Sequence, residues 1–208
     1  MIHCIGDSHV NVFGGADTML PMWTYVGKDL PGYRSYRLRP RAAYNLSLDI
    51  ASMGLIETII KEQVAEKDYV LLCYGEIDCR KHLPKYLDVD FCVTHYLQAV
   101  ERIRRLHDKL IVWGPHLTMK NSSTKGYGTY TARMFMTERF NSVLKQCCDK
   151  EGILFATAHR ELLLDNKLPN PEYFAKYTDT DIHLSSAALK IILPIIERAV
   201  QCGTSGQK

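Results

Sequence analysis

The sequence predicts an α/β protein: a three-layer αβα sandwich in which helices cover both faces of a five-stranded parallel sheet. Short apolar runs, typical of buried strands, alternate with longer segments whose apolar residues recur at helical spacing. Polar clusters follow directly after the expected strands, and in parallel sheets ligands bind at the carboxyl ends of the strands. The 208 residues are 46% hydrophobic, which is enough for one full core.

Each strand prediction rests on a short run with its own pattern. The segments MIHCI and DYVLLCYG are apolar runs followed or ended by glycine, whereas YRSYRLR alternates apolar and Arg residues, as a half-exposed strand does. The expected strands are residues 1–5, 33–39, 68–75, 109–115 and 152–158.

The helices are predicted from apolar positions three or four residues apart. The expected helices are residues 50–67, 94–108, 131–150 and 185–200. Ser185 or Ser186 is the expected N-cap of the last helix, and Pro194 should kink it or split it in two. Residues 114–130, rich in Ser, Thr and Gly, read as a loop that acts as a lid or binding element. Residues 1–203 should form one domain and 204–208 a flexible tail.

Composition excludes several classes of protein. No apolar run is long enough for a membrane span, and the start turns polar at Gly6 and Asp7 before a signal peptide could form. Seven cysteines, mainly in apolar segments, suit reduced thiols and a cytoplasmic location. Neither a Cys-x-x-Cys pair nor a His-Glu-x-x-His motif occurs, so we expect no metal and no cofactor. A net charge of +3 is too weak to indicate nucleic acid. The oligomeric state stays open.

The turn after the first strand, Gly6-Asp7-Ser8-His9, raises the question of a nucleophile. Taken alone, Ser8 is a common turn residue. His183 lies just before the last helix, however, with Asp179 and Asp181 close by. A histidine whose ring is oriented by a carboxylate can take the proton of a serine hydroxyl. A packing role for His183 and a solvated turn for the two Asp residues are the alternatives.

Three blocks in this order, GDSH, GEID and DIHLS, resemble the SGNH (GDSL) hydrolases across nearly the whole chain. The segment GEIDCR also resembles one subgroup, whose members often accompany glycan-modifying enzymes. The resemblance implies a flavodoxin-like sandwich and a metal-independent serine esterase or acyltransferase. Ser8 would be the nucleophile and His183 the base. The backbone N–H of Ser8 would be one oxyanion donor.

Departures from the family pattern leave roles open. The family's acid lies three residues before the histidine, where this chain has Thr180. The acid is therefore Asp181, which we favour, or Asp179, unless a Ser–His dyad operates. The family's block Gly-x-Asn-Asp starts here at Gly75, but its Asn position holds Ile77. Loss of one oxyanion donor typically costs ~10²–10³ in turnover.

Several residues are candidates for the missing oxyanion donors or for substrate binding. The family's second block has a glycine, which is lacking in RPRAAYN, so a backbone N–H of Ala42 or Ala43 would donate instead. Further candidates are Arg41, Asn45, Gly75 and Arg80.

Other charged residues each allow a functional and a structural interpretation. Arg37, Arg39 and Arg41 recur at period two, as a basic wall for a carboxylate or phosphate would, or as a charged edge strand. His9 either lines the pocket or is structural. Glu76, Asp78 and Arg80 are also readable as an internal salt-bridged network that shapes their loop.

The function expected from the sequence is a serine-dependent esterase that acts on small acyl esters, most simply acetyl esters, of a sugar or glycan. One alternative is an O-acyltransferase on a glycan. Another is a catalytically degraded member of the fold that binds a glycan or a protein. A flavodoxin-like nucleotide binder is disfavoured because no Gly-rich phosphate loop follows the first strand.

Overall fold

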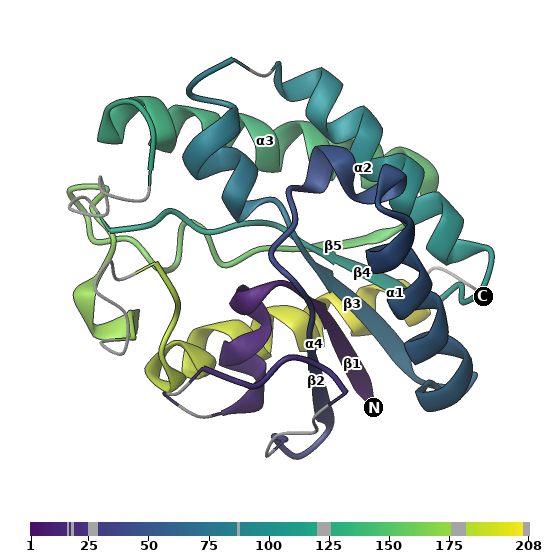
Figure 1. Ribbon diagram of the computed structural model, residues 1–208. Coiled ribbons are helices and arrows are strands. Elements are labelled where there is room, and N and C mark those ends of the chain that lie inside the picture. Colours follow the sequence, from purple (N-terminus) through teal and green to yellow (C-terminus); the bar gives the residue numbers. More distant parts are fainter. Residues whose placement is uncertain are drawn as a thin grey trace.

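The computed structural model describes residues 1–15, 17, 19–24, 29–86, 88–119, 126–175 and 182–205. Its centre is one five-stranded sheet in the order β2-β1-β3-β4-β5, with every neighbouring pair parallel (Figure 1). The strands are β1 (Ile2–Gly6), β2 (Tyr33–Arg37), β3 (Tyr69–Cys73), β4 (Leu110–Trp113) and β5 (Leu154–Ala156).

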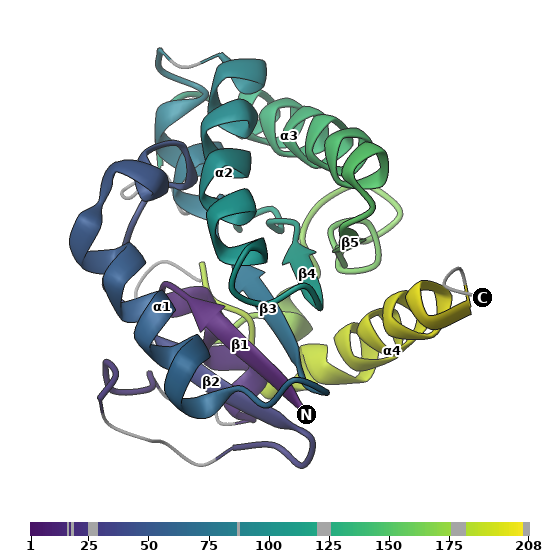
Figure 2. The same cartoon turned by 90° about the vertical axis from the view of Figure 1, so that its right-hand side faces the viewer.

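Helices cover both faces of the sheet. They are α1 (Ile50–Gln63), α2 (Val89–Arg104), α3 (Tyr130–Glu151) and α4 (Leu189–Ser205). Figure 2 shows α1, α2 and α3 on one side of the sheet and α4 on the other. The predicted three-layer α/β sandwich with a parallel sheet is therefore confirmed.

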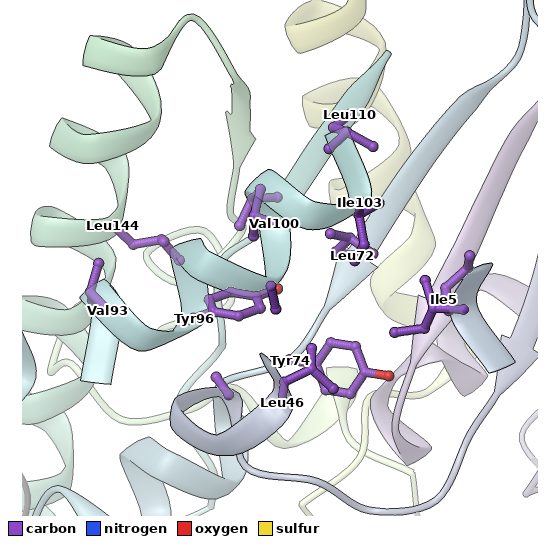
Figure 3. Close-up of a cluster of buried hydrophobic side chains, with 14 of the residues drawn as sticks. Ile5, Leu46, Leu72, Tyr74, Val93, Tyr96, Val100, Ile103, Leu110 and Leu144 are labelled. Atoms are coloured by element: carbon purple, nitrogen blue, oxygen red, sulfur yellow. The ribbon is translucent and has the colours of Figure 1, made fainter. Parts of the chain in front are cut away.

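Each face of the sheet has its own core. On one face, Tyr96 and Val100 of α2 and Leu144 of α3 pack over Ile5 and Leu72 of the strands (Figure 3). On the other face, Ile192 and Ile196 of α4 lie in one cluster with Val10 and Phe13, which belong to a short 3₁₀ helix, Ser8–Gly14. Within the described part of the chain, no helix is both long and apolar enough to cross a membrane.

The strand order fixes where a site can form. The chain moves from β1 to β2 on one side and then returns to β3 on the other, so the order reverses between β1 and β3. Open parallel sheets bind ligands at such a switch point, beyond the carboxyl ends of the strands. Gly6 ends β1 so close to β3 that an added Cβ would lie 2.2 Å from the Cys73 carbonyl oxygen. The turn after Gly6 therefore begins directly against β3.

Several element boundaries differ from the prediction. The strand expected at 33–39 ends at Arg37, because its partner β1 ends at Gly6; the N–H of Leu38 still donates to Gly6 O, and beyond it β2 has no strand to pair with among the described residues. Arg39 and Arg41 thus share no strand face with Arg37. The second helix starts at Val89 rather than near 94, since the Asp88 carboxylate accepts the N–H of Phe91 as an N-cap.

The C-terminal helix is one element. α4 runs through Pro194 to Ser205 and follows a 3₁₀ turn, Ser186–Ala188, for which Ser185 is the N-cap residue. The expected split at Pro194 is not seen. The helix extends into the segment assigned to a tail, of which residues 206–208 lie outside the described residues.

Candidate active site

Ser8 is presented by the turn between β1 and the 3₁₀ helix Ser8–Gly14. Asp7, which is fully buried, caps this helix: its Oδ1 accepts the N–H of His9 at 2.9 Å. As the first residue of the helix, Ser8 has an N–H without an intrahelical acceptor. Its hydroxyl is half-buried, at the carboxyl edge of the sheet where the strand order reverses.

The structure brings Ser8 and His183 together. The Ser8 hydroxyl donates to His183 Nε2 at 2.7 Å, although 175 positions separate the two residues along the chain. The His183 side chain is nearly inaccessible to solvent. A serine hydroxyl hydrogen-bonded to a neutral imidazole is the arrangement that a nucleophile and its general base require.

The segment that carries His183 is anchored on both sides of the residue. His116, which follows β4, donates its Nε2–H to the carbonyl of Ile182 at 3.1 Å. The carbonyl of His183 accepts the N–H of Ala175 at 2.9 Å, and Phe174 and Leu184 form an antiparallel bridge. The ring of His183 is therefore positioned by backbone contacts to two other parts of the chain.

A buried ion cluster lies next to this pair. His9 Nε2 donates to Glu76 Oε2 at 2.9 Å, and Arg80 donates to both oxygens of Glu76, at 2.6 and 3.1 Å. All three side chains are buried. The His9 ring centroid lies 4.9 Å from that of His183 and 5.2 Å from that of His116.

Burial and these charges set the protonation states. Burial alone lowers the pKa of His9, but the charges of Glu76 and Asp7 outweigh it and raise the pKa above its usual value. Burial, followed by the charge of His9, holds the pKa of His183 far below its usual value. The same two causes lower the pKa of His116 to about 3. His183 and His116 are therefore neutral at neutral pH, which leaves His183 able to accept a proton.

Solved structures share this fold. No family model matches the sequence, and no curated protein is significantly similar to it. A GDSL-like lipase from Bacteroides thetaiotaomicron matches with a TM-score of 0.61 and 14% identity, over 97% of this chain and 87% of the lipase chain. A carbohydrate acetylesterase from Sinorhizobium meliloti matches with a TM-score of 0.60 and 12% identity, over 97% of this chain and 98% of its own. A catalytic mutant of an acetylxylan esterase from Geobacillus stearothermophilus matches with a TM-score of 0.56 and 17% identity, over 96% and 93%.

This chain has the SGNH-hydrolase fold. The fold that the sequence resemblance implied is thereby confirmed, with the block GDSH after β1 and the block GEID after β3 at the switch point of the sheet. The likeness to the GEIDCR subgroup stays a prediction.

Within the SGNH fold, Asp78 of the block GEID has a structural role. Asp78 is fully buried and accepts the N–H of Ala43 at 2.6 Å and that of Tyr44 at 3.4 Å, as well as the thiol of Cys92 at 3.4 Å. Burial raises its pKa to about 7 against these hydrogen bonds. The Ala43 N–H already donates to Asp78, so it is not available to an oxyanion. This rules out Ala43 as one of the two predicted backbone donors.

The other predicted binding residues are placed as follows. Ala42 is the N-cap residue of the 3₁₀ helix Ala43–Leu48, and Asn45, in that helix, has an amide oxygen that is buried without a partner among the described residues. Arg41 forms an ion pair with Asp49. Gly75 has a φ of +108° and lies against Phe140, so its role is conformational.

Arg80, the remaining candidate donor, is committed to Glu76. Its carbonyl also accepts the N–H of Tyr127, which ties the residues before α3 to this cluster. The interpretation of Glu76 and Arg80 as members of an internal salt-bridged network agrees with the geometry, whereas Asp78 binds backbone N–H groups and a thiol and forms no ion pair with the described residues. Asp179 and Asp181 lie outside the described residues, as does residue 180 between them.

Sequence reasoning missed His116 as part of the site. Its only signal was the position of Gly-Pro-His at the end of the fourth strand. Its contact with Ile182 depends on a segment 66 residues away, which no local pattern reveals. Among the described residues, no three His, Cys, Asp or Glu side chains gather in a way that would hold a metal ion.

Proposed function

We propose that this protein is an esterase that cleaves small acyl esters, with Ser8 as the nucleophile and His183 as the general base. The observation that carries the proposal is the 2.7 Å hydrogen bond from Ser8 to a buried, neutral His183. The SGNH fold around it, shared with lipases and acetylesterases, supports the same reaction class.

The reaction would proceed in two halves. Ser8 Oγ attacks the acyl carbonyl carbon while His183 Nε2 takes the hydroxyl proton. The N–H of Ser8 donates to the oxyanion, and the proton on His183 then passes to the leaving alcohol as the ester bond breaks. Water, deprotonated by His183, attacks the acyl-enzyme, which releases the acid and restores Ser8.

We further propose that the leaving alcohol is a sugar or glycan hydroxyl and the acyl group acetyl. A hollow of about 400 Å³ beyond the carboxyl end of β2 supports this substrate. Trp23, Leu38, Arg39 and Arg41 line it together with α1. Leu38 donates its N–H to Gly6 O, two residues before Ser8, although neither Ser8 nor His183 lines the hollow itself. An aromatic ring beside guanidinium groups suits an alcohol carrier with both apolar and polar faces.

A serine-reactive fluorophosphonate tests the proposal. The wild type should be labelled on Ser8 and should hydrolyse p-nitrophenyl acetate, whereas Ser8→Ala should do neither. Ser142→Ala removes an exposed serine of α3 and is the matched control, with labelling and turnover like the wild type. Equal labelling of wild type and Ser8→Ala, or no labelling of either, would refute the esterase and favour a protein that only binds its ligand.

The acetylated carrier is tested separately. Acetylated xylo-oligosaccharides should release acetate faster than p-nitrophenyl butyrate is cleaved, and mass spectrometry of the intact protein should show an acetyl adduct on Ser8. Transfer of that acetyl group to an added sugar, in preference to water, would instead identify an O-acyltransferase.

A further inference from the structure

The charged groups beside Ser8 and His183 take no part in the proposed reaction. His9 follows the nucleophile in the chain, but its side chain points away from solvent and into the protein. Burying a histidine, a glutamate and an arginine together is costly unless each is paired. Here each is paired: Arg80 donates a hydrogen bond to each carboxylate oxygen of Glu76, and His9 Nε2 donates to one of these oxygens. The negative charges of Glu76 and Asp7 raise the pKa of His9, which favours the charged ring over the neutral one.

The second ring nitrogen of His9 supports the same state. His9 Nδ1 is buried and makes no hydrogen bond with the described residues, and neither does Asp7 Oδ2. Both residues line one small pocket of about 10 Å³, which is near the lower limit for holding one water. A water in this pocket would accept from a protonated Nδ1–H, while burial raises the pKa of the Asp7 carboxyl that also lines it. Both ring nitrogens of His9 then carry protons and both have acceptors.

The charge on His9 faces the catalytic base. The two ring centroids are 4.9 Å apart, with planes inclined by 32°, and little solvent reaches either ring. Charges separated by this distance in a site of low dielectric interact strongly. A positive charge on His9 therefore opposes a second proton on His183.

We propose that His9, held by Glu76 and Arg80, is a positioning residue that presents a buried positive charge to His183 and so keeps the base neutral and ready to accept the Ser8 proton. The inference rests on the proposed function for its catalytic meaning, but its electrostatic content concerns His183 alone. It adds a second histidine to the site, one that acts through the first and does not touch the substrate.

The sign of the effect depends on every charged or titratable group that faces the two rings. Among the described residues, these are Asp7 beside the 3₁₀ helix, Glu76 and Arg80 after β3, His116 after β4, and Cys73 and Tyr74 at the end of β3; residues 176–181, ahead of His183, lie outside the described part of the chain. In His9→Gln the positive charge is lost and the negative charge of Glu76 is less compensated. Both changes favour a proton on His183, so its titration moves to higher pH.

The test is an NMR titration of the histidine ring protons in the full-length protein, with the His183 signal assigned from His183→Ala. His9→Gln should raise the midpoint of the His183 titration by about one pH unit or more. The acid limb of kcat/KM should move by the same amount. His107→Gln, which removes a histidine that contacts Asp68 O ahead of β3, should move neither. An unchanged His183 midpoint in folded His9→Gln overturns the inference.

Two further measurements keep the test decisive. If His9→Gln does not fold, the ¹⁵N shifts of His9 in the wild type decide: two protonated ring nitrogens at pH 7 support the inference, and a neutral ring overturns it. If the wild type neither hydrolyses esters nor reacts with the fluorophosphonate, the proposed function fails, while the His183 titration still tests the electrostatic role of His9.

Discussion

Ser8 and His183 depend on their neighbours for almost everything that would make them reactive. Asp7 caps the helix that presents Ser8, and His116 anchors the carbonyl before His183. His183, the proposed base, is buried, which keeps it neutral. The chemistry at the scale of single residues thus belongs to a small network rather than to one serine.

Removal of the base gives the first prediction. His183→Ala should lower kcat/KM for p-nitrophenyl acetate by a factor of ~10²–10⁴, because general base catalysis contributes about that much. Steady-state kinetics measure it, and the control His107→Gln should retain wild-type values. A loss of less than about tenfold would mean that His183 is not the base.

His116 should act on kcat rather than on KM. His116→Phe removes the donor to the Ile182 carbonyl, so the base is held less well and kcat should fall by about tenfold or more at nearly constant KM. His116→Gln retains an N–H donor and should recover part of the loss. Equal defects in the two variants, or a change confined to KM, would contradict a role in holding the His183 segment.

At the scale of elements, the edge strand β2 and the loop after it separate two tasks. The strand pairs with β1 and forms one edge of the sheet. The residues after Arg37 leave the sheet and line the hollow together with α1. Trp23 is held there through its backbone N–H, which donates to Arg37 O, and its ring lies edge-on to Tyr36. This hollow, rather than the strand face, is where a carrier would contact arginine.

The hollow is tested by Trp23→Ala. The variant should raise KM for an acetylated oligosaccharide by about tenfold, the equivalent of ~1.4 kcal/mol, because a large aromatic contact is lost. Its rate with p-nitrophenyl acetate, which has no sugar, should stay near that of the wild type. Phe135→Ala removes an exposed aromatic of α3 as a control. A KM for the oligosaccharide that does not change would place the carrier elsewhere.

At the scale of the whole molecule, Asp78 connects three parts of the fold. Its carboxylate joins the residues after β3 to the 3₁₀ helix Ala43–Leu48 and to Cys92 of α2. Burial raises its pKa from 3.8 to about 7. Between these values the folded protein holds a proton that the unfolded chain has released. The stability contributed by Asp78 is therefore fully present below about pH 4 and is lost as the pH rises to about 7.

Asp78→Asn removes this linkage. The free energy of unfolding of the wild type, relative to that of Asp78→Asn, should fall by up to ~1.4 kcal/mol for each pH unit between about pH 4 and pH 7, and then level off. Urea unfolding at a series of pH values measures both proteins. A constant difference across this range would show that Asp78 is ionised in the folded state.

The sequence was most informative about the framework. Alternating apolar runs and helical periodicity predicted the parallel sheet, the helices on both faces and the edge at which a site should lie, because burial patterns are local. Boundaries were less accurate where a single contact decides them. The Asp88 cap starts α2 early, and the end of β1 at Gly6 ends β2 at Arg37.

By itself, the sequence determined the α/β class, the order of the blocks GDSH, GEID and DIHLS, and the choice of Ser8 and His183 as candidates. Only the tertiary structure decided that these two side chains meet and that the N–H of Ala43 donates to Asp78. It also decided that His9, Glu76 and Arg80 form one buried cluster beside Ser8 and His183. The physical reason is distance along the chain. Local pattern indicates which face of an element is buried. Contacts between residues that are tens of positions or more apart arise only when the sheet assembles and brings the ends of its strands together.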